Sequence, residues 1–275
     1  MGNRVAVVGV GQTKHKSKHK EVSIAGLVRQ AAERALEDAG CTWKDIDALI
    51  LGKAPDMFEG VVMPELYLSD ALGANGKPVL RVHTAGSVGG STAVVAASRD
   101  AEAARTVQGV FHRPAFRVYT GNDLIGVELG GALKNVIAIA AGVCDGLGFG
   151  DNSKAALITR GIAEMSRLGV SCGARPETFA GLSGLGDLTV TCFSKLSRNR
   201  SFGERIGRGE KAAEILAATR TAVEGHPTAR SAGELADRLG VPCPIIAEVR
   251  AMLYAGKEPR HAVADLLGRD SKAEG

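Results

Sequence analysis

The stretch ELGGALKNVIAIAAG, residues Glu128–Gly142, has the composition of a buried helix with one misfit inside it. Its only basic side chain is Lys134, which follows two glycines and precedes a largely apolar run. A buried ammonium is costly unless another group pairs with it. The pattern therefore predicts a helix over about Ile125–Asp145 that lies in the core and holds a lysine in need of a partner or a task.

The chain changes character near Asp123. Before this residue, short β-branched runs alternate with helical patterns, and after it strand patterns almost vanish. We expect an α/β N-terminal segment of βαβ units followed by an all-α C-terminal helical domain. The expected divisions are 1–91, 92–123 and 124–275, and the middle one is a single β-α-β unit.

Individual elements follow from caps, turns and periodicity. The segment Ser23–Gly40 begins with a serine cap and ends on a glycine stop, so it predicts an amphipathic helix. The other elements expected in the first half are strands at 4–11, 46–52, part of 77–92, 93–97 and 116–119, and helices at 64–74 and 100–111. The helices expected in the second half are 125–145, 153–168, 176–180, 200–206, 212–217, 228–239 and 245–254.

The run RVAVVGVG, residues 4–11, ends in glycines, as does the first strand of a dinucleotide-binding fold. Gly9 and Gly11 occupy the first two glycine positions of G-x-G-x-x-G, but Lys14 stands at the third. No strand ending in an acidic residue follows at the expected distance. The dinucleotide-binding fingerprint is therefore incomplete.

Composition indicates a globular protein, since the chain has 275 residues, 45% hydrophobic and 23% charged, with a net charge of +4. One tryptophan and three tyrosines offer no stacking platform for bases, so nucleic acid is not expected as a partner. Five scattered cysteines without a C-x-x-C motif predict reduced thiols and a cytoplasmic protein. We expect no metal site, no membrane span and no signal peptide.

Three polar clusters stand out in the helical half. The first is Lys134, the second is Asp187 within the glycine-rich GLSGLGDLTVTC (181–192), and the third is SRNR (197–200) at a helix start. Each has a plain structural alternative: the lysine extends to solvent, the aspartate caps a turn, and SRNR begins a solvated helix. Taken one at a time, these alternatives are favoured.

Taken together, the three clusters favour a catalytic site over the separate structural roles. A lysine in an apolar groove suits proton transfer, and a nearby aspartate would orient it. Ser197, Arg198 and Asn199 offer a hydroxyl, a guanidinium and an amide beside the backbone N–H groups of a helix start, which suits phosphate. We therefore expect a small phosphorylated substrate that carries a hydroxyl or carbonyl group.

Long motifs between residues 92 and 275 carry a resemblance to a known family. These are FRVYTGNDLIGVELGGALKNVIAIAAGVCDGLGFGDNSKAALITRGIAEMSRLG (116–169), TFAGLSGLGDLTVTC (178–192), SRNRSFG (197–203) and AVEGHPTARSAGELADRLGVPCPI (222–245). They resemble the bacterial NAD(P)-dependent glycerol-3-phosphate dehydrogenases. The resemblance implies an oxidoreductase that interconverts sn-glycerol 3-phosphate and dihydroxyacetone phosphate with NAD(P), in the cytoplasm and in glycerophospholipid synthesis. A homodimer is left open as the assembly.

The resemblance also implies the residues that act on the substrate. Lys134 matches the family's proton acceptor for the substrate hydroxyl, and Asp187 matches a residue of the same substrate site. The glycines before the lysine, Gly130 and Gly131, would leave room for the substrate.

Further positions match binding residues of the family. Ser197, Arg198 and Asn199 match its substrate-binding triplet, and Arg198 is also implied to face the cofactor. Ala222 and Glu224 match two more cofactor contacts. No residue is implied as a metal ligand.

Residues 1–91 resemble a different family. VAVVGVGQTKH, AAERALEDAGCTWKDIDALILG and GKPVLRVHTAGSVGGSTA resemble the N-terminal part of thiolase-like proteins of the lipid-transfer type. Where thiolases carry a nucleophilic cysteine, the nearest hydroxyl here is Ser87, so thiolase chemistry is not expected.

Two interpretations other than an active dehydrogenase stay open. One is a chimeric or fusion protein without the cofactor domain, which acts as a binding or dimerisation module. The other is a thiolase-like scaffold for a lipid-pathway protein. Because the glycine fingerprint is incomplete, hydride transfer by this chain is expected to be weak or undetectable even with Lys134 in place.

Overall fold

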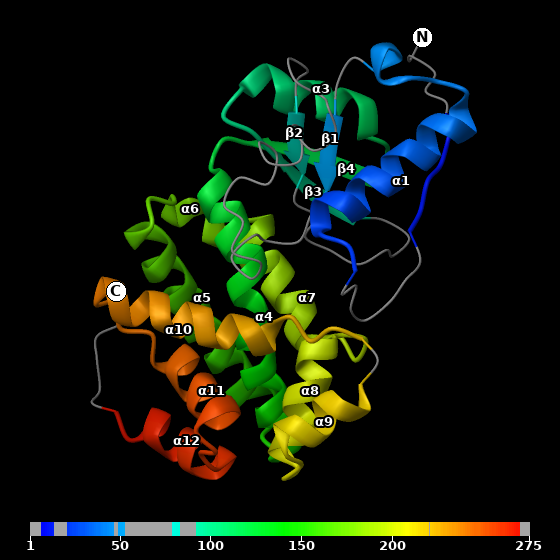
Figure 1. The fold of residues 1–275 in the computed structure, drawn as a ribbon. Coiled ribbons are helices and arrows are strands. Elements are labelled where there is room, and N and C mark those ends of the chain that lie inside the picture. Colours follow the sequence, from blue (N-terminus) through cyan, green and yellow to red (C-terminus); the bar gives the residue numbers. More distant parts are fainter. Residues whose placement is uncertain are drawn as a thin grey trace.

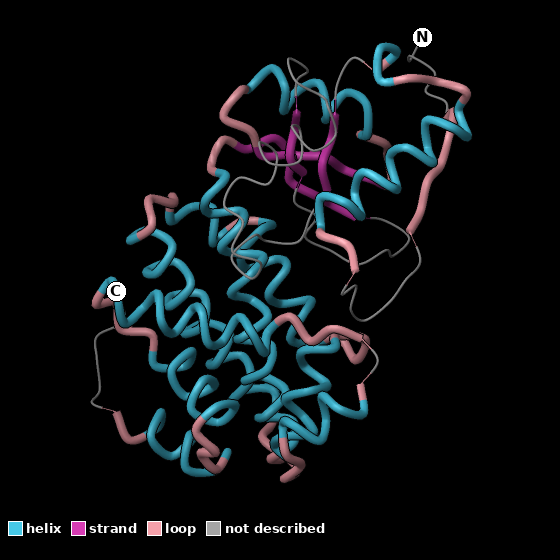
Figure 2. The backbone as a smooth tube through the Cα atoms, viewed as in Figure 1, coloured by secondary structure: helices cyan, strands magenta, loops and turns pink. Residues whose placement is uncertain are grey.

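The computed structural model describes residues 7–13, 21–46, 49–52, 79–82, 92–219 and 221–269. Figure 1 shows two parts: a small α/β part with strands β1–β4 and helices α1 and α3, and a larger helical part around helix α4. Coloured by secondary structure, the described strands gather in the first part (Figure 2). The molecule is mostly helical, and the expected change from α/β to helical structure is confirmed at this level.

Two parallel strand pairs form the sheets of the α/β part. Strand β1 (Leu49–Gly52) pairs with β2 (Val79–Val82), and β3 (Thr92–Ala97) pairs with β4 (Phe116–Gly121). Helix α3 (Ala101–Phe111) connects β3 to β4, as a parallel pair requires.

The β3–α3–β4 unit has a small core of its own. Val94 and Ala96 of β3 are buried together with Val107 of α3 and Val118 of β4. The β-α-β arrangement predicted for this stretch is confirmed, and β4 extends to Gly121.

Helix α1 (Ile24–Ala39) begins and ends at the predicted caps. The Ser23 hydroxyl accepts a hydrogen bond from the Gly26 N–H at 3.1 Å. Gly40 ends the helix with a φ of 64°, a left-handed conformation that glycine adopts without strain. A short 3-10 turn, Trp43–Asp45, follows.

The strand predicted over residues 4–11 is wrong for the part that the structure describes. Residues 7–13 form no strand, and Val10 is 68% exposed. This segment instead lies against α1 so closely that a Cβ on Gly9 would stand 2.3 Å from the Ala35 carbonyl oxygen. A segment whose backbone faces a helix does not join a sheet edge.

Other expectations for the first half are only partly covered by the described residues. The strands expected at 46–52 and within 77–92 correspond to β1 and β2 where they are described. The helix expected at 64–74 lies outside the described residues, and so does Ser87.

The helical part follows the predicted series with additions. Its helices are α4 (Leu124–Gly146), α5 (Asp151–Ser171), α6 (Pro176–Ala180), α7 (Asp187–Phe193), α8 (Arg198–Gly207), α9 (Ala212–Ala218), α10 (Gly225–Leu239), α11 (Pro244–Tyr254) and α12 (Pro259–Leu267). Sequence analysis missed α7, α12 and the π-helical turn Leu182–Gly186. These elements are short, so their apolar periodicity is weak.

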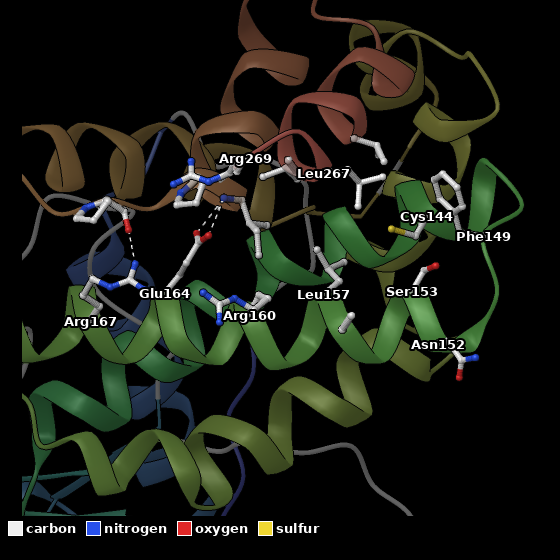
Figure 3. A pocket seen from close by; sticks show the side chains of 16 residues that line it. Cys144, Phe149, Asn152, Ser153, Leu157, Arg160, Glu164, Arg167, Leu267 and Arg269 are labelled. Atoms are coloured by element: carbon white, nitrogen blue, oxygen red, sulfur yellow. Dashed lines mark hydrogen bonds between the residues drawn. The ribbon is translucent and has the colours of Figure 1, made fainter. Parts of the chain in front are cut away.

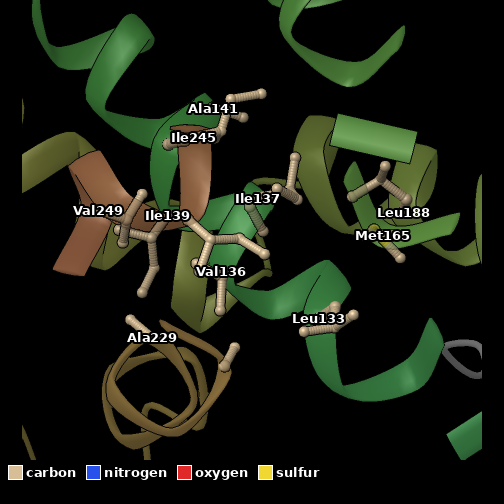
Figure 4. Packing of buried hydrophobic residues seen from close by; sticks show 14 of the residues in the cluster. Leu133, Val136, Ile137, Ile139, Ala141, Met165, Leu188, Ala229, Ile245 and Val249 are labelled. Atoms are coloured by element: carbon tan, nitrogen blue, oxygen red, sulfur yellow. The ribbon is translucent and has the colours of Figure 1, made fainter. Parts of the chain in front are cut away.

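Helix α4 is the centre of the helical part. Its Leu133, Val136, Ile137 and Ile139 are fully buried, and Figure 4 shows them among side chains of the surrounding helices. Among the described helices, α4 is long and apolar enough to cross a membrane, with a mean hydropathy of 1.6, but 67% of that window is buried inside the protein. Its apolar residues therefore form part of the hydrophobic core of the protein.

Helices α4 and α8 pack with their backbones in close contact. A Cβ on Gly142 of α4 would stand 1.9 Å from the Arg200 carbonyl oxygen, and one on Gly203 of α8 would stand 2.0 Å from the Ile139 carbonyl oxygen. One turn further along each helix, glycines again face the partner backbone. Side chains at these positions would force the two helices apart.

We expect Gly203→Ala to lower the free energy of unfolding by about 1–3 kcal/mol, because backbone atoms must move to admit the methyl group. Gly109→Ala in α3 is the matched control, since a Cβ there meets nothing within 4 Å. That control should leave stability unchanged or raise it by up to about 1 kcal/mol through better helix propensity. Urea unfolding of both variants measures the difference, and equal effects would contradict close packing of α4 on α8.

Candidate functional site

Lys134 and Asp187 form a buried ion pair. Lys134 Nζ contacts Asp187 Oδ2, and their side chains are only 15% and 3% exposed. Lys134 lies in α4, and Asp187 is the first residue of α7, which directly continues the π-helical turn Leu182–Gly186. The lysine thus has the partner that its burial requires.

A close backbone contact joins α4, which carries Lys134, to the turn that leads into Asp187. A Cβ on Gly130 would stand 2.3 Å from the Ser183 carbonyl oxygen, in the π-helical turn that leads into Asp187. The glycine therefore admits the turn that carries the aspartate. This differs from the expectation that Gly130 leaves room for the substrate, whereas the half-buried Gly131 stays a candidate for that role.

Asn199 joins the start of α8 to α4. Its side-chain Nδ2 donates to Asn135 Oδ1 at 3.0 Å, and its Oδ1 accepts a hydrogen bond from the Gly225 N–H at 2.8 Å. Since Asn135 follows Lys134 directly in α4, all three polar clusters of the sequence meet at neighbouring residues of this helix. The side chain of Asn199 is buried, and both its amide nitrogen and its amide oxygen form hydrogen bonds.

Arg198 lies at the surface beside the start of α10. Its guanidinium Nη2 donates to Glu224 Oε1 at 2.5 Å, and the Arg198 side chain is 49% exposed. Ala222 lies two residues earlier and is exposed. The three residues expected to contact a cofactor are therefore neighbours in sequence or in space, on the outside of the α8–α10 junction.

The Ser197 hydroxyl caps α8. It accepts a hydrogen bond from the Arg200 N–H at 3.2 Å. The structural alternative, in which SRNR begins a helix, is therefore correct for Ser197. A capping hydroxyl still has its own proton to donate to a ligand.

An ion-pair network holds the SRNR segment against the end of α4. Arg200 donates from Nη1 to Asp145 Oδ2 at 2.6 Å and from Nε to the Ser194 carbonyl at 3.1 Å. The Lys154 ammonium pairs with the other oxygen of Asp145. The segment before α8 is thus tied to α4 and α5 by buried charges.

Two residues of this region were missed by sequence analysis. Asn135 is the hydrogen-bond partner of Asn199, and its signal was an amide within an apolar run. The Ser183 hydroxyl is buried and has no hydrogen-bond partner in the described part of the chain. Buried polar groups without a partner are rare in native proteins, so Ser183 is a candidate for contact with a ligand.

The cysteines do not add a nucleophile to this region. All five are free, and burial raises the pKa of Cys144 to about 11 and that of Cys192 to about 12. Both remain protonated thiols near neutral pH, whereas the thiolate is the reactive form.

The fold and this site define a class of protein: a short parallel β-α-β unit followed by a helical domain whose central helix holds a buried lysine–aspartate pair. The family model for the C-terminus of NAD-dependent glycerol-3-phosphate dehydrogenase matches residues 123–264, about half of the chain. The chain belongs to the NAD-dependent glycerol-3-phosphate dehydrogenase family.

Individual relatives agree with this assignment. A glycerol-3-phosphate dehydrogenase, NAD(P)+, of Geobacter sulfurreducens is 58% identical over 183 residues, which are 66% of this chain and 55% of the relative. One from Geobacter sp. strain M21 is 50% identical over 232 residues, 84% of this chain and 68% of the relative. A crystal structure of glycerol-3-phosphate dehydrogenase from Coxiella burnetii has a TM-score of 0.71 at 31% identity, over 86% of this chain and 79% of that one.

The comparisons also concern the N-terminal part. The chain spans about half of the Geobacter sulfurreducens relative, 55% of its length. The match to the strain M21 protein is longer than the stretch 92–275, so it includes part of residues 1–91. The resemblance of residues 1–91 to thiolase-like proteins finds no support in these comparisons.

We expect a double-mutant cycle to show strong coupling between Lys134 and Asp187. Asp187→Asn leaves a buried ammonium without its counter-charge and should lower the free energy of unfolding by about 3–5 kcal/mol. Lys134→Met leaves the buried carboxylate without its counter-charge and should cost a similar amount. The double variant should recover much of this loss.

The matched control is the pair Arg29–Glu33 on α1, whose side chains are 59% and 50% exposed. Its coupling should be about 0.3–0.5 kcal/mol, as is usual for exposed helix pairs. Purely additive losses at Lys134 and Asp187 would mean that the ammonium is solvated rather than held by the aspartate.

Proposed function

We propose that the chain acts as an oxidoreductase that interconverts sn-glycerol 3-phosphate and dihydroxyacetone phosphate with NAD(P). The observation that carries the proposal is the buried Lys134–Asp187 pair next to the Asn135–Asn199 contact on α4. Family membership supports the same reaction. The proposed setting is the cytoplasm and glycerophospholipid synthesis, and a homodimer remains an expectation.

Lys134 is the proposed proton donor and acceptor. In the direction of reduction, its ammonium gives a proton to the carbonyl oxygen of dihydroxyacetone phosphate while a hydride is added to the carbonyl carbon. In the reverse direction, the neutral amine takes the proton of the C2 hydroxyl as the hydride leaves. Asp187 orients the ammonium toward the position proposed for the substrate.

The start of α8 is the proposed site for the substrate phosphate. The exposed Arg198 guanidinium has a planar set of donors that suits a phosphate group. The Ser197 hydroxyl lies beside it, and Asn199 holds the segment on α4. Glu224 occupies one side of Arg198, so a bound phosphate would share or replace that carboxylate.

The residues present fit part of an NAD(P) site. NAD(P), when bound, supplies or accepts the hydride. Arg198, Ala222 and Glu224 are proposed to contact it at the α8–α10 junction. Residues 7–13 do not fit its pyrophosphate, because Gly9 and Gly11 face the backbone of α1 and form no strand-to-helix turn. No cofactor-dependent step is therefore assigned to that segment.

Residues 92–123 and 124–275 are proposed as two functional parts. The first is a remnant β-α-β unit of a nucleotide-binding domain, and the second is the substrate domain. The alternative is a binding module without turnover, and steady-state kinetics separates it from the enzyme.

Steady-state oxidation of NADH with dihydroxyacetone phosphate tests the proposal. Lys134→Met should lower kcat/KM by about 100-fold or more, the usual effect of removing a general acid. Lys211→Met, at an exposed position before α9, is the control and should leave kcat/KM unchanged. Because residues 7–13 lack the glycine cradle, turnover of the unaltered chain should fall well below a typical kcat of about 10 per second.

Two outcomes would contradict the proposal. Turnover that survives Lys134→Met would remove the lysine from the reaction. Absence of any turnover, together with saturable binding of sn-glycerol 3-phosphate in calorimetry, would identify the chain as a binding module.

A further inference from the structure

A cavity lies away from the Lys134–Asp187 pair. Its volume is about 740 Å³, within the range of small-molecule sites, and it lies between α5, α11 and α12 (Figure 3). Helix α4 reaches it at Cys144, which is about 15 Å further along the helix than Lys134. The cavity is therefore separate from the proposed catalytic site.

Apolar side chains form most of the cavity wall. Leu157 lines it from α5, and Val263 and Leu266 line it from α12. Figure 3 shows Phe149 and Cys144 at one end of this wall. An aliphatic chain would displace water from this surface, and its burial would be favourable.

Three arginines gather toward the opposite end. Arg160 and Arg167 project from α5, and Arg269 follows α12 (Figure 3). The Arg167 guanidinium donates to the Pro242 carbonyl. Within the described residues, no ion pair joins a carboxylate to Arg160 or Arg269, and both side chains are exposed.

Glu164 does not neutralise this cationic end. Its carboxylate accepts hydrogen bonds from the N–H groups of Ile245 at 2.8 Å and Ile246 at 3.2 Å, at the start of α11. Burial raises the pKa of Glu164 to about 7, so the group is only partly ionised at neutral pH. The arginines therefore leave a net positive charge at one end of an apolar cavity.

We propose that this cavity binds an amphiphilic anion, an unbranched alkyl chain with a carboxylate or phosphate monoester head. The chain lies along α5 between Ser153 and Glu164, a rise of about 16 Å that suits a dodecyl chain. The head group meets Arg160 and Arg269. Inorganic phosphate alone would leave the apolar wall in contact with water, and an uncharged chain would form no charge-assisted hydrogen bond with the arginines.

This site does not depend on the proposed dehydrogenase reaction. Binding can be measured on the full chain by titration calorimetry with dodecanoate below its micellar concentration. We expect one dodecanoate per chain. A second titration with dodecyl phosphate shows which of the two head groups binds more tightly. Dodecan-1-ol and dodecyltrimethylammonium should bind at least tenfold more weakly, because neither carries negative charge.

Variants locate the head group. Exposed arginines can be replaced without disturbing the core, so Arg160→Ala combined with Arg269→Ala should fold normally and weaken dodecanoate at least tenfold. Arg105→Ala, an exposed arginine of α3, is the control and should leave binding unchanged. Thermal unfolding of each variant confirms that it is folded.

Glu164 should make ligand binding at this cavity depend on pH. Arg160, Arg167 and Arg269 are charged groups that line the cavity with Glu164, and Cys243 is a titratable group near it, whose pKa burial raises to about 11. Glu164 is thus the group that changes charge near neutral pH. Because its ionisation repels an anion, dodecanoate should bind more weakly as pH rises from 6 to 8, and Glu164→Gln should remove this slope.

The proposal is overturned by any of three results. The first is equal binding of dodecyltrimethylammonium and dodecanoate. The second is unchanged binding in the double arginine variant. The third is uptake of many dodecanoate molecules per chain without saturation, which would indicate detergent-like adsorption.

Discussion

The backbone of α4 lies in direct contact with the backbones of its neighbours, and this close approach determines where the other helices of the helical part begin. Where α4 meets α8, glycines on both helices face carbonyl groups of the partner. At the other end of α4, Gly130 admits the Ser183 carbonyl in the same way. These contacts bring the starts of α7 and α8, with Asp187 and Asn199, to one region of α4. Ordinary side chains at the same positions would separate the polar residues by more than a hydrogen bond can span.

Buried charge is the second feature that the structure must accommodate. The pair Lys134–Asp187 lies toward one end of the glycine-lined region, and Asp145 holds Lys154 and Arg200 toward the other. Such pairs contribute little net stability, because desolvation of the ions offsets their attraction. Their value here is geometric, since they fix the direction of Lys134, the proposed proton donor, and of the segment that precedes α8. A site for proton transfer needs that order before the substrate arrives.

Local signals in the sequence predicted much of the fold. Ser23 and Gly40 marked the ends of α1, and helical spacing located α4 and α5 to within a few residues. The strand predicted over residues 4–11 was wrong for its described part, because an apolar β-branched run does not show whether it packs on a sheet or on a helix. The motif residues of the candidate site could be named, but their contacts could not. Asn135 bonds to a residue 64 positions away, and such a contact depends on packing that no local pattern encodes.

A crystal structure of the chain with sn-glycerol 3-phosphate would show whether Lys134 is the proton-transfer group, because it places the reacting atoms without any need for turnover. We expect the C2 hydroxyl of the ligand within hydrogen-bonding distance of Lys134 Nζ, the Lys134–Asp187 contact retained, and the phosphate at the start of α8 beside Arg198. A ligand bound elsewhere, or one that meets Arg198 while its C2 hydroxyl points away from Lys134, would exclude Lys134 from proton transfer.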